Sequence, residues 1–541
     1  MSLAFTATQT ELIPVKMIAP LLLLLPLAGG ILLSLWRVNA RLYAMTITLV
    51  TFAVSLVAVR QFDFSQSHML QFAASQPWVT TFGLHFSFGV DSISLWLVLL
   101  TTFLMPLVVL GSFSAVKDRL CEFYVWLLLL EAAMIGVFVA QDIIFFYICF
   151  EFTLIPLYFL IGIYGSTQRL KAARIFFLYT FTGSMLTFAG VLYVAWFASL
   201  PQQFGTWTFA IEDLTKAAQQ MSYGQQAWVL AAMLAGFAVK VPLFPFHTWL
   251  PLAHTEAPTA GSVILAGVLL KLGTYALLRF AIPMTPQAIE DFAPYIGTFA
   301  VIGILYTALI CWVQKDIKKL IAYSSVSHLG FCVLGMFSLT PIGMSGSVMH
   351  MINHGLSTGA LFLCVGMIYE RFHTREMRQM GGLARVMPIW AFFMVFFCLA
   401  SVGLPGLNGF VGEFLSLLGT FTANQLLGPK FAVTAGLGMI LAAIYILYMV
   451  GKVVFGPIKV PPDHAHPKDL NLREIVTLTP LAIACLWLGL LPTTVLSTLE
   501  QPIDQIINNP TLMHAHTNNA CGVMDDSAQS LGRLAKAEHA R

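Results

Sequence analysis

Apolar runs of about twenty residues recur along this chain from Val15 to Ser497, separated only by short polar breaks. A helix of about 20 apolar residues crosses the hydrocarbon core of a bilayer, so these runs are long enough to span a membrane. Only 10% of the 541 residues are charged, whereas soluble proteins carry about 25%. Because so few charges cannot cover a water-facing surface, the sequence predicts an all-α polytopic membrane protein embedded in the lipid bilayer.

The charged and Pro/Gly-rich breaks divide the chain into about 14 predicted transmembrane helices. The first run, from Met17 to Trp36, is followed by no small-residue cleavage site, so it is interpreted as a retained helix and not as a signal peptide. The predicted helices begin near Met17, Leu42, Asp91, Cys121, Ile143, Ala173, Ala227, Thr259, Tyr295, Lys318, Ser345, Pro388, Phe431 and Glu474.

Two of these helices, the seventh and the twelfth, contain motifs that interrupt a helix. They are AVKVPLFPFHTWLP, from Ala238 to Pro251, and VGLPGLNGFVGEF, from Val402 to Phe414. Proline removes a backbone donor, and lipid tolerates broken helices only where protein or a water-filled cavity lines them. One charged residue accompanies each break, Lys240 in the first and Glu413 in the second.

The two broken helices lie five helices apart, which suggests inverted repeats of helices 4–8 and 9–13. The predicted organisation follows from these repeats. It comprises helices 1–3 in residues 1–120, a first antiporter-like repeat in 121–281, a second in 282–456, the last transmembrane helix in 457–500, and a polar C-terminal tail in 501–541.

The loop charges predict the orientation. If the loops alternate between the two sides of the membrane, 18 Lys and Arg residues fall on one side and 8 on the other, and Lys240 and Lys271 complete the total of 28. The positive-inside rule assigns the richer side to the cytoplasm. Both termini are therefore predicted on the non-cytoplasmic side.

The sequence also excludes several classes of function. The 8 cysteines are dispersed without a CxxC pair, and neither a GxGxxG after a strand nor a GxxxxGK[ST] motif is present. We therefore predict no cofactor and no metal in this chain. The net charge of +3 gives no reason to expect nucleic acid as a partner.

Seven titratable residues fall inside the predicted helices. An ionised side chain at a helix centre costs roughly 2.5 to 3.5 kcal/mol on insertion scales, so each needs a partner, water or a function. Carboxylates, lysines and histidines can gain and lose protons near neutral pH when burial and neighbours tune them, which suits a proton relay. The residues are Glu151, Lys240, Lys271, His328, His350, His354 and Glu413.

Each of these residues also has a structural interpretation. Glu151 could form a static ion pair, and Lys240 could extend toward the membrane interface, although about thirteen apolar residues precede it. Burial would favour the neutral amine of Lys240, whereas a carboxylate such as Glu151 would favour the charged one. Lys271 is centred in SVILAGVLLKLGTYALL, far from either interface, which favours a functional role.

The histidines and Glu413 allow the same two interpretations. His328 could be a satisfied core histidine, and the glycines before Glu413 could simply allow close helix packing. His350 and His354 lie four residues apart on one helix face, but haem would need a ligand from a facing helix. Four further charged residues near predicted helix ends are interpreted as structural or interfacial: Glu131, Asp142, Asp316 and Arg371.

Several motifs in combination resemble the antiporter-like subunits of complex I, the proton-translocating NADH-quinone oxidoreductase, and most closely the subunit M group, whose mitochondrial counterpart is NADH dehydrogenase subunit 4. The matching stretches cover about residues 80 to 455. A glutamate at position 413 is typical of that group, and Leu252 stands where the family usually has an aspartate. The motifs include FYICFEFTLIPLYFLIGIYG, AGFAVKVPLFPFHTWLP, HTEAPTAGSVILAGVLLKLGTYALLRF, QKDIKKLIAYSSVSHLGF, INHGLSTGALFLCVGMIYER and GLPGLNGFVGEF.

The resemblance implies a role for each candidate residue. Glu151 and Lys240 would handle protons in a first half channel, Lys271 and His328 would bridge the centre, and Glu413, with His354 nearby, would serve the exit. It also implies that NADH, FMN, iron–sulfur clusters and quinone belong to other subunits. The partners would be other membrane-arm subunits, including the related subunits L and N, in a bacterial inner membrane.

Two other functions remain compatible with the sequence. Multisubunit cation/proton antiporters share the fold, so this chain could be a subunit of one of them. A purely structural scaffold is disfavoured because several buried charges have no evident partner in the sequence.

Overall fold

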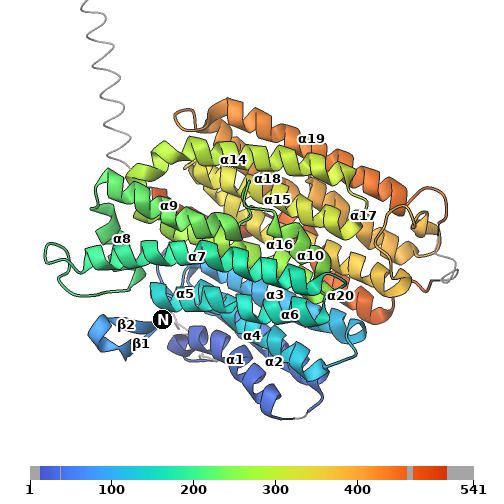
Figure 1. Ribbon diagram of the computed structural model, residues 1–541, viewed down its shortest axis with the longest axis horizontal. Helices are drawn as coiled ribbons and strands as arrows, with labels where there is room; N and C mark the ends of the chain where they lie inside the picture. Colours follow the sequence, from blue (N-terminus) through green and yellow to red (C-terminus); the bar gives the residue numbers. More distant parts are fainter. Residues whose placement is uncertain (1–12, 37, 460–466, 508–541) are drawn as a thin grey trace, which may run out of the picture.

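The computed structural model describes residues 13–36, 38–459 and 467–507 as a bundle of long helices running side by side (Figure 1). Within these ranges, 12 helices are long and apolar enough to cross a membrane. This result confirms the predicted all-α polytopic membrane fold. The total of about 14 crossings, the inverted repeats and the domain boundaries stay predictions.

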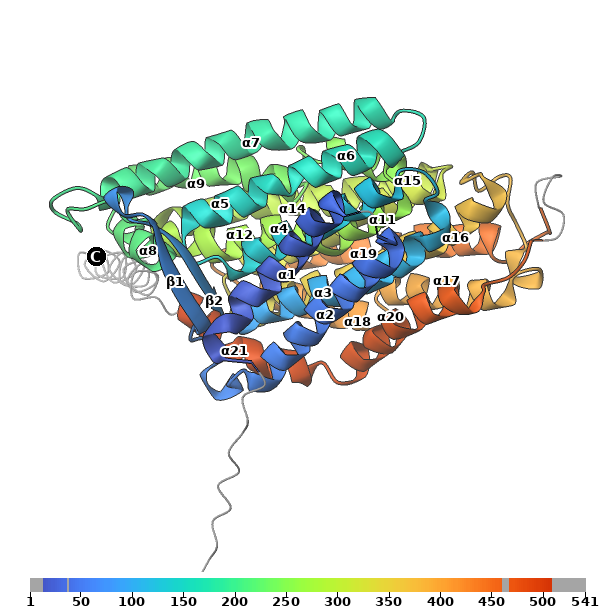
Figure 2. The same ribbon diagram turned by 90° about the horizontal axis from the view of Figure 1, so that it is seen from below.

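Ten of the 12 spans are single helices. Figure 2 shows α7 along one edge of the bundle and α20 along the opposite edge. The ten are α1 (Ile18–Leu35), α2 (Ala40–Gln61), α3 (Ser92–Ala115), α4 (Leu120–Val139), α7 (Arg169–Ala198), α14 (Pro286–Val313), α15 (Ile317–Phe337), α16 (Pro341–Phe372), α19 (Gly428–Val453) and α20 (Leu472–Leu490).

The other two spans contain local irregularities. One is divided at Thr153 into α5 (Ile143–Phe152) and α6 (Leu154–Tyr164). Pro156 explains this division, because it has no N–H to donate to the carbonyl of Phe152. The other comprises α11 (Thr259–Ile264), α12 (Leu270–Ala276) and α13 (Ile282–Met284), joined by π-helical stretches at Leu265–Leu269 and Leu277–Ala281.

Both expected broken helices are interrupted. In the first, α9 (Tyr223–Lys240) ends at the predicted lysine, and α10 (Trp249–Glu256) begins after a break that contains two prolines. In the second, α17 (Pro388–Val402) is followed by α18 (Asn408–Thr422). The second break needs glycine, because Gly403 and Gly406 have φ values of 82° and 92°.

A two-stranded antiparallel sheet was not anticipated. Strands β1 (Gln71–Val79) and β2 (Leu84–Val90) form a hairpin between α2 and α3. The segment LHFSFGV alternates apolar and polar residues, which is the pattern of a half-buried strand. Both figures place this hairpin at the same end of the bundle as the short helix α8 (Ile211–Gln219).

The chain after α20 also differs from the prediction. The predicted polar tail begins at residue 501, but helix α21 (Thr493–Ile507) continues seven residues into it. Pro502, Ile503 and Ile506 are buried, so packing holds this segment in place. The rest of the predicted tail lies outside the described residues. Single-turn 3₁₀ helices occur at Val15–Met17, Phe64–Gln66, Thr80–Phe82 and Leu383–Arg385.

Candidate functional site

Lys240 lies where helix α9 stops, directly before the first break. Its side chain is only 3% exposed. The amine donates a hydrogen bond to the Thr153 hydroxyl at 3.2 Å and lies 4.4 Å from the centroid of the Phe150 ring. The last carbonyls of a helix are unpaired and aromatic faces carry a negative potential, so both attract positive charge, whereas burial opposes it.

Glu151 interacts electrostatically with Lys240 but does not touch it. The two side chains influence each other's charge, yet they form no ion pair within 4.0 Å among the described residues. Neither carboxyl oxygen of the half-buried Glu151 has a hydrogen-bond partner there. The structure therefore places the two predicted residues close together but not in direct contact.

Lys271 occupies α12 between the two π-helical stretches and is fully buried. Its amine contacts the carbonyl oxygen of Ala266 and lies 2.8 Å from Nδ1 of His354. Local π-helix is common at functional sites, and these two stretches could not be predicted from the apolar pattern. No acidic group forms an ion pair with Lys271 within the described residues, so a histidine and a carbonyl are its direct partners.

Gly273 allows helix α12, which carries Lys271, to pack against the first break. A Cβ atom at Gly273 would lie 2.8 Å from Val241 Cγ2, 3.0 Å from Val241 N and 3.1 Å from Lys240 Cβ. A Cβ atom would therefore be too close to the Val241 side chain and tight against its backbone, so glycine allows this approach. This contact connects the helix that carries Lys271 to the backbone beside Lys240.

Glu413 lies on α18 and is 1% exposed. Its Oε1 atom is 2.7 Å from Nδ1 of His328 and 3.9 Å from Nε2 of His350. The other nitrogen of His328 lies 3.3 Å from the Ser401 hydroxyl. A Cβ at Gly403 would be 3.1 Å from Oε2 of Glu413, so the carboxyl group points back toward the second break.

The structure shows which of the central residues bond to one another, which the sequence did not specify. Lys271 bonds to His354, whereas His328 bonds to Glu413. The spacing along each helix shows which turn a residue occupies but not which partner faces it, so sequence alone could not settle the pairing.

His350, one of the seven candidate residues, belongs to this cluster, although the family resemblance implies no role for it. Its ring centroid is 6.0 Å from that of His328 and 6.3 Å from that of His354, and His328 and His354 are 5.9 Å apart. Neither nitrogen of His350 has a hydrogen-bond partner among the described residues. The four-residue spacing between His350 and His354 was the sequence signal that both rings lie on one helix face.

Three groups in this cluster are also close enough to bind a metal. One ligand atom each from His328, His350 and Glu413 lies within 4.8 Å of the others. However, His328 and Glu413 already share a hydrogen bond, and a cation would have to replace the proton between them. The predicted absence of metal and cofactor stays a prediction.

Two further buried groups were misplaced or missed. Glu131 was interpreted as structural or interfacial, but it lies in the middle of α4 and is 0% exposed, so the interfacial placement is wrong. Its carboxyl oxygens have no partner among the described residues. His254 on α10 was missed. Its ring stacks on Phe362 with centroids 4.7 Å apart, and both of its nitrogens lack partners in the described part of the chain.

The other three residues interpreted as structural make structural contacts. Asp142 caps α5 and Asp316 caps α15 through backbone N–H groups. Arg371 forms an ion pair with Glu474 at 2.7 Å. These contacts fit helix caps and a surface-proximal ion pair.

Together the buried groups form a line across the bundle. It begins at Glu151 and Lys240, passes the contact at Gly273 to Lys271 and His354, and ends at His328, His350 and Glu413. Each group can hold or release a proton, and those after Gly273 are joined by hydrogen bonds or adjacent rings. Such a series of buried titratable groups inside a polytopic helical bundle is typical of ion-translocating membrane proteins.

Comparison with known proteins identifies the family. The family described as "NADH:quinone oxidoreductase/Mrp antiporter, TM" matches residues 140–441. NADH-quinone oxidoreductase subunit M of Rhodobacter capsulatus is 43% identical over 474 residues, covering 87% of this chain and 91% of the relative. NADH-ubiquinone oxidoreductase chain 4 of Arabidopsis thaliana is 43% identical over 495 residues, covering 90% of this chain and 96% of the relative.

Solved structures agree with this assignment. A chain of respiratory complex I from Thermus thermophilus with bound NADH has a TM-score of 0.82 and 32% identity, with 92% of this chain and 100% of that chain covered. A chain of the Mrp complex from Dietzia sp. DQ12-45-1b has a TM-score of 0.78 at 19% identity, covering 92% of this chain and 99% of its own length, which shows the fold alone. The chain belongs to the NADH:quinone oxidoreductase/Mrp antiporter family, within the group that contains subunit M and chain 4.

Proposed function

We propose that this chain is a proton-translocating subunit in the membrane arm of an NADH-quinone oxidoreductase, complex I. The observation that carries the proposal is the buried line of titratable groups from Lys240 through Lys271 to Glu413. The names of the relatives support the choice of complex. NADH, FMN, iron–sulfur clusters and quinone would be bound by other subunits, and electron transfer would take place there.

Each residue has a chemical role in this proposal. Glu151 sets the charge of Lys240, which takes up a proton and passes it toward Lys271. The amine of Lys271 exchanges the proton with Nδ1 of His354 across 2.8 Å. His328 and His350 then deliver it to Glu413, whose carboxyl group points toward the break after α17 and releases it there.

The energy would arrive electrostatically from neighbouring subunits. Moving one charge against 100 mV costs about 2.3 kcal/mol. Two unit charges 4 Å apart interact by about 4 kcal/mol at an effective dielectric constant of 20. A change in the charge of one neighbour is therefore large enough to drive a proton along this line.

The proposal includes an assembly and a location. The partners are other membrane-arm subunits, including the related subunits L and N, and the lipid bilayer of a bacterial inner membrane. The bias of loop charges toward one side supports a multi-pass topology with both termini away from the cytoplasm. No role for nucleic acid is proposed.

Purification of the intact complex tests the proposal. We expect this chain to co-purify with NADH-binding and quinone-binding subunits, and we expect NADH to drive proton uptake into sealed inverted vesicles. Co-purification with small antiporter subunits only, together with sodium/proton exchange that needs no NADH, would instead identify a cation/proton antiporter.

A further inference from the structure

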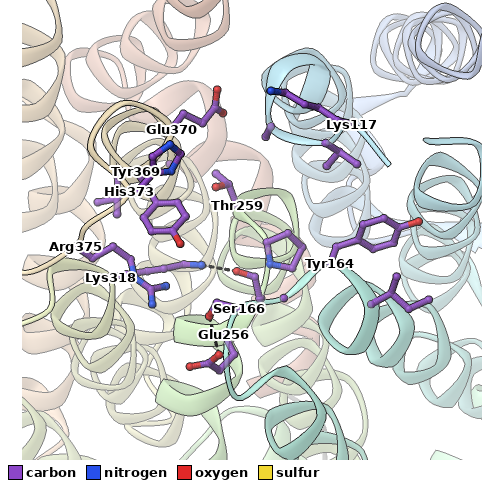
Figure 3. Close-up of a pocket in the computed structure, with 18 of the residues that line it drawn as sticks. Lys117, Tyr164, Ser166, Glu256, Thr259, Lys318, Tyr369, Glu370, His373 and Arg375 are labelled. Carbon is purple, nitrogen blue, oxygen red and sulfur yellow. Dashed lines mark hydrogen bonds between the residues drawn. The ribbon is translucent and has the colours of Figure 1, made fainter. Parts of the chain in front are cut away.

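Figure 3 shows in close-up the residues that line a cavity of about 440 Å³. The helix ends that contribute them lie at the end of the bundle opposite the β1–β2 hairpin (Figure 2). The cavity is lined by the loop after α3, the turn after α6, the α10–α11 junction, and the adjoining ends of α15 and α16. The loop-charge bias assigns this end to the cytoplasm. The cavity holds room for several water molecules, and polar side chains surround it.

Lys318 lies at the edge of this cavity and is only 6% exposed. Among the described residues it is one of three buried lysines, and the other two, Lys240 and Lys271, belong to the proposed relay. Its amine donates to the carbonyl oxygen of Ala257 at the end of α10, as the dashed line in Figure 3 shows.

The acids near Lys318 are engaged elsewhere. Glu256 accepts hydrogen bonds from the Ser166 hydroxyl at 2.6 Å and from the backbone N–H of Gln168 at 2.8 Å. Asp316 lies 3.4 Å from Arg375. The amine of Lys318 therefore makes no direct contact with a carboxylate within the described residues, and it borders a cavity large enough to hold water.

His254 is a second buried titratable group near the amine of Lys318. It is three residues from Ala257, is 0% exposed, and has no hydrogen-bond partner for either ring nitrogen among the described residues. The ring stacks on Phe362 of α16, about two turns after His354 on the same helix. The ring therefore lies between the end of α10, to which Lys318 bonds, and the helix that carries His354.

We propose that the cavity, Lys318 and His254 form a second proton-uptake branch that reaches Lys271 without passing Glu151 and Lys240. This inference rests on the proposed function. A neutral Lys318 takes up a proton that the cavity water relays from the aqueous solution, which leaves that water neutral, and gives it to an unprotonated nitrogen of His254. His254 then gives its proton to the neutral amine of Lys271, and a bridging water completes any gap longer than a hydrogen bond.

A structural role for Lys318 makes a different prediction. A cation that only binds the last carbonyl of α10 would be replaced well by arginine, which keeps the charge and the donors. Arginine stays protonated in proteins and so cannot relay a proton. The Lys318→Arg variant therefore separates the two roles.

The experiment compares Lys318→Arg, Lys318→Gln and His254→Gln in the intact complex. Lys319→Arg and Lys319→Gln are matched controls, because Lys319 follows on the same helix and does not line the cavity. NADH-driven proton uptake in sealed inverted vesicles is divided by NADH oxidation with an artificial acceptor, which reports assembled complex. We expect a partial loss of about two- to threefold for all three test variants and none for the controls, because the route through Glu151 and Lys240 still supplies Lys271.

Full uptake in Lys318→Arg would overturn the branch. If neither Lys318 variant assembles, His254→Gln decides, and full uptake in that variant would equally overturn it. Glu413→Gln is measured alongside to separate this inference from the proposed function. If Glu413→Gln is impaired while Lys318→Arg is not, only the branch is wrong; if neither is impaired, the proposed function fails with it.

Discussion

The two broken helices hold their charged residues in different ways. Lys240 at the first break contacts a hydroxyl and an aromatic ring, and its acidic neighbour Glu151 makes no direct contact with it. Glu413 near the second break shares a 2.7 Å hydrogen bond with His328. The charge of Lys240 can therefore change in response to an electric field without breaking an ion pair, whereas a proton at Glu413 moves along a hydrogen bond that already exists.

Close packing by glycine is common to both regions. Gly273 lets the central helix touch the backbone beside Lys240, and Gly412 lets α18 approach His350 so closely that a Cβ would lie 2.5 Å from its Cβ. Glycine thus permits close helix contact at both breaks. The two breaks differ in how the charged side chain is compensated, by a distant acid at Lys240 and by a hydrogen bond at Glu413.

The largest effect is expected where the contact is direct. Glu413→Gln keeps the size of the side chain but cannot carry the proton that Glu413 shares with His328, so NADH-driven proton uptake should fall at least about tenfold. Glu500→Gln, an exposed acid on α21, is the control. Near-normal uptake by Glu413→Gln in an assembled complex would show that its hydrogen bond is only structural.

A smaller effect is expected from the pair that does not touch. Glu151→Ala and Lys240→Ala should each lower proton uptake several-fold, because removing either residue leaves a buried charge without its counterpart. The double variant should be little worse than the poorer single one, since the two act as a unit. Losses that simply multiply in the double variant would mean that the two residues act independently.

The helix packing beside the second break can be tested without changing a charged residue. In Gly412→Ala the new methyl would lie 2.6 Å from the Cα of His350, so the helices must separate. We expect destabilisation of about 1 to 3 kcal/mol and reduced uptake. The control is Gly436→Ala on α19, where nothing lies within 4 Å. Equal melting temperatures for the two variants would contradict the packing argument.

The smallest effect is expected at an acid outside the line. Glu131 is as buried as Glu413 but makes no hydrogen bond among the described residues, and an isolated buried carboxyl group is held neutral. Glu131→Gln should therefore pump at close to the normal rate, as measured by proton uptake per assembled complex. A loss as large as that of Glu413→Gln would extend the relay to α4.

Sequence patterns predicted the features that depend on composition and spacing. Apolar runs predicted the membrane helices, and the Pro/Gly motifs predicted the interruptions beside Lys240 and before Glu413. These signals are local, so a single chain contains them. The alternation in LHFSFGV was also present and would have predicted strand β2.

Features that depend on contacts between helices could not be predicted in this way. The bonds from Lys271 to His354 and from His328 to Glu413 depend on which helix faces meet. The burial of His254 depends on where α10 packs. The π-helical stretches around Lys271 likewise leave no mark on the apolar pattern. Helical spacing shows which residues share a face, but it does not show what that face touches.

Lys271 provides the most direct test, because both regions of the line meet at it. Lys271→Met keeps a long apolar side chain and removes the proton carrier, while Lys430→Met removes an exposed lysine at the start of α19. The measurement is the rate of NADH-driven proton uptake in sealed inverted vesicles, normalised to assembled complex. The account predicts a loss of at least about tenfold for Lys271→Met and none for Lys430→Met. Full uptake in an assembled Lys271→Met complex would contradict the claim that protons cross this chain along its buried line of titratable groups.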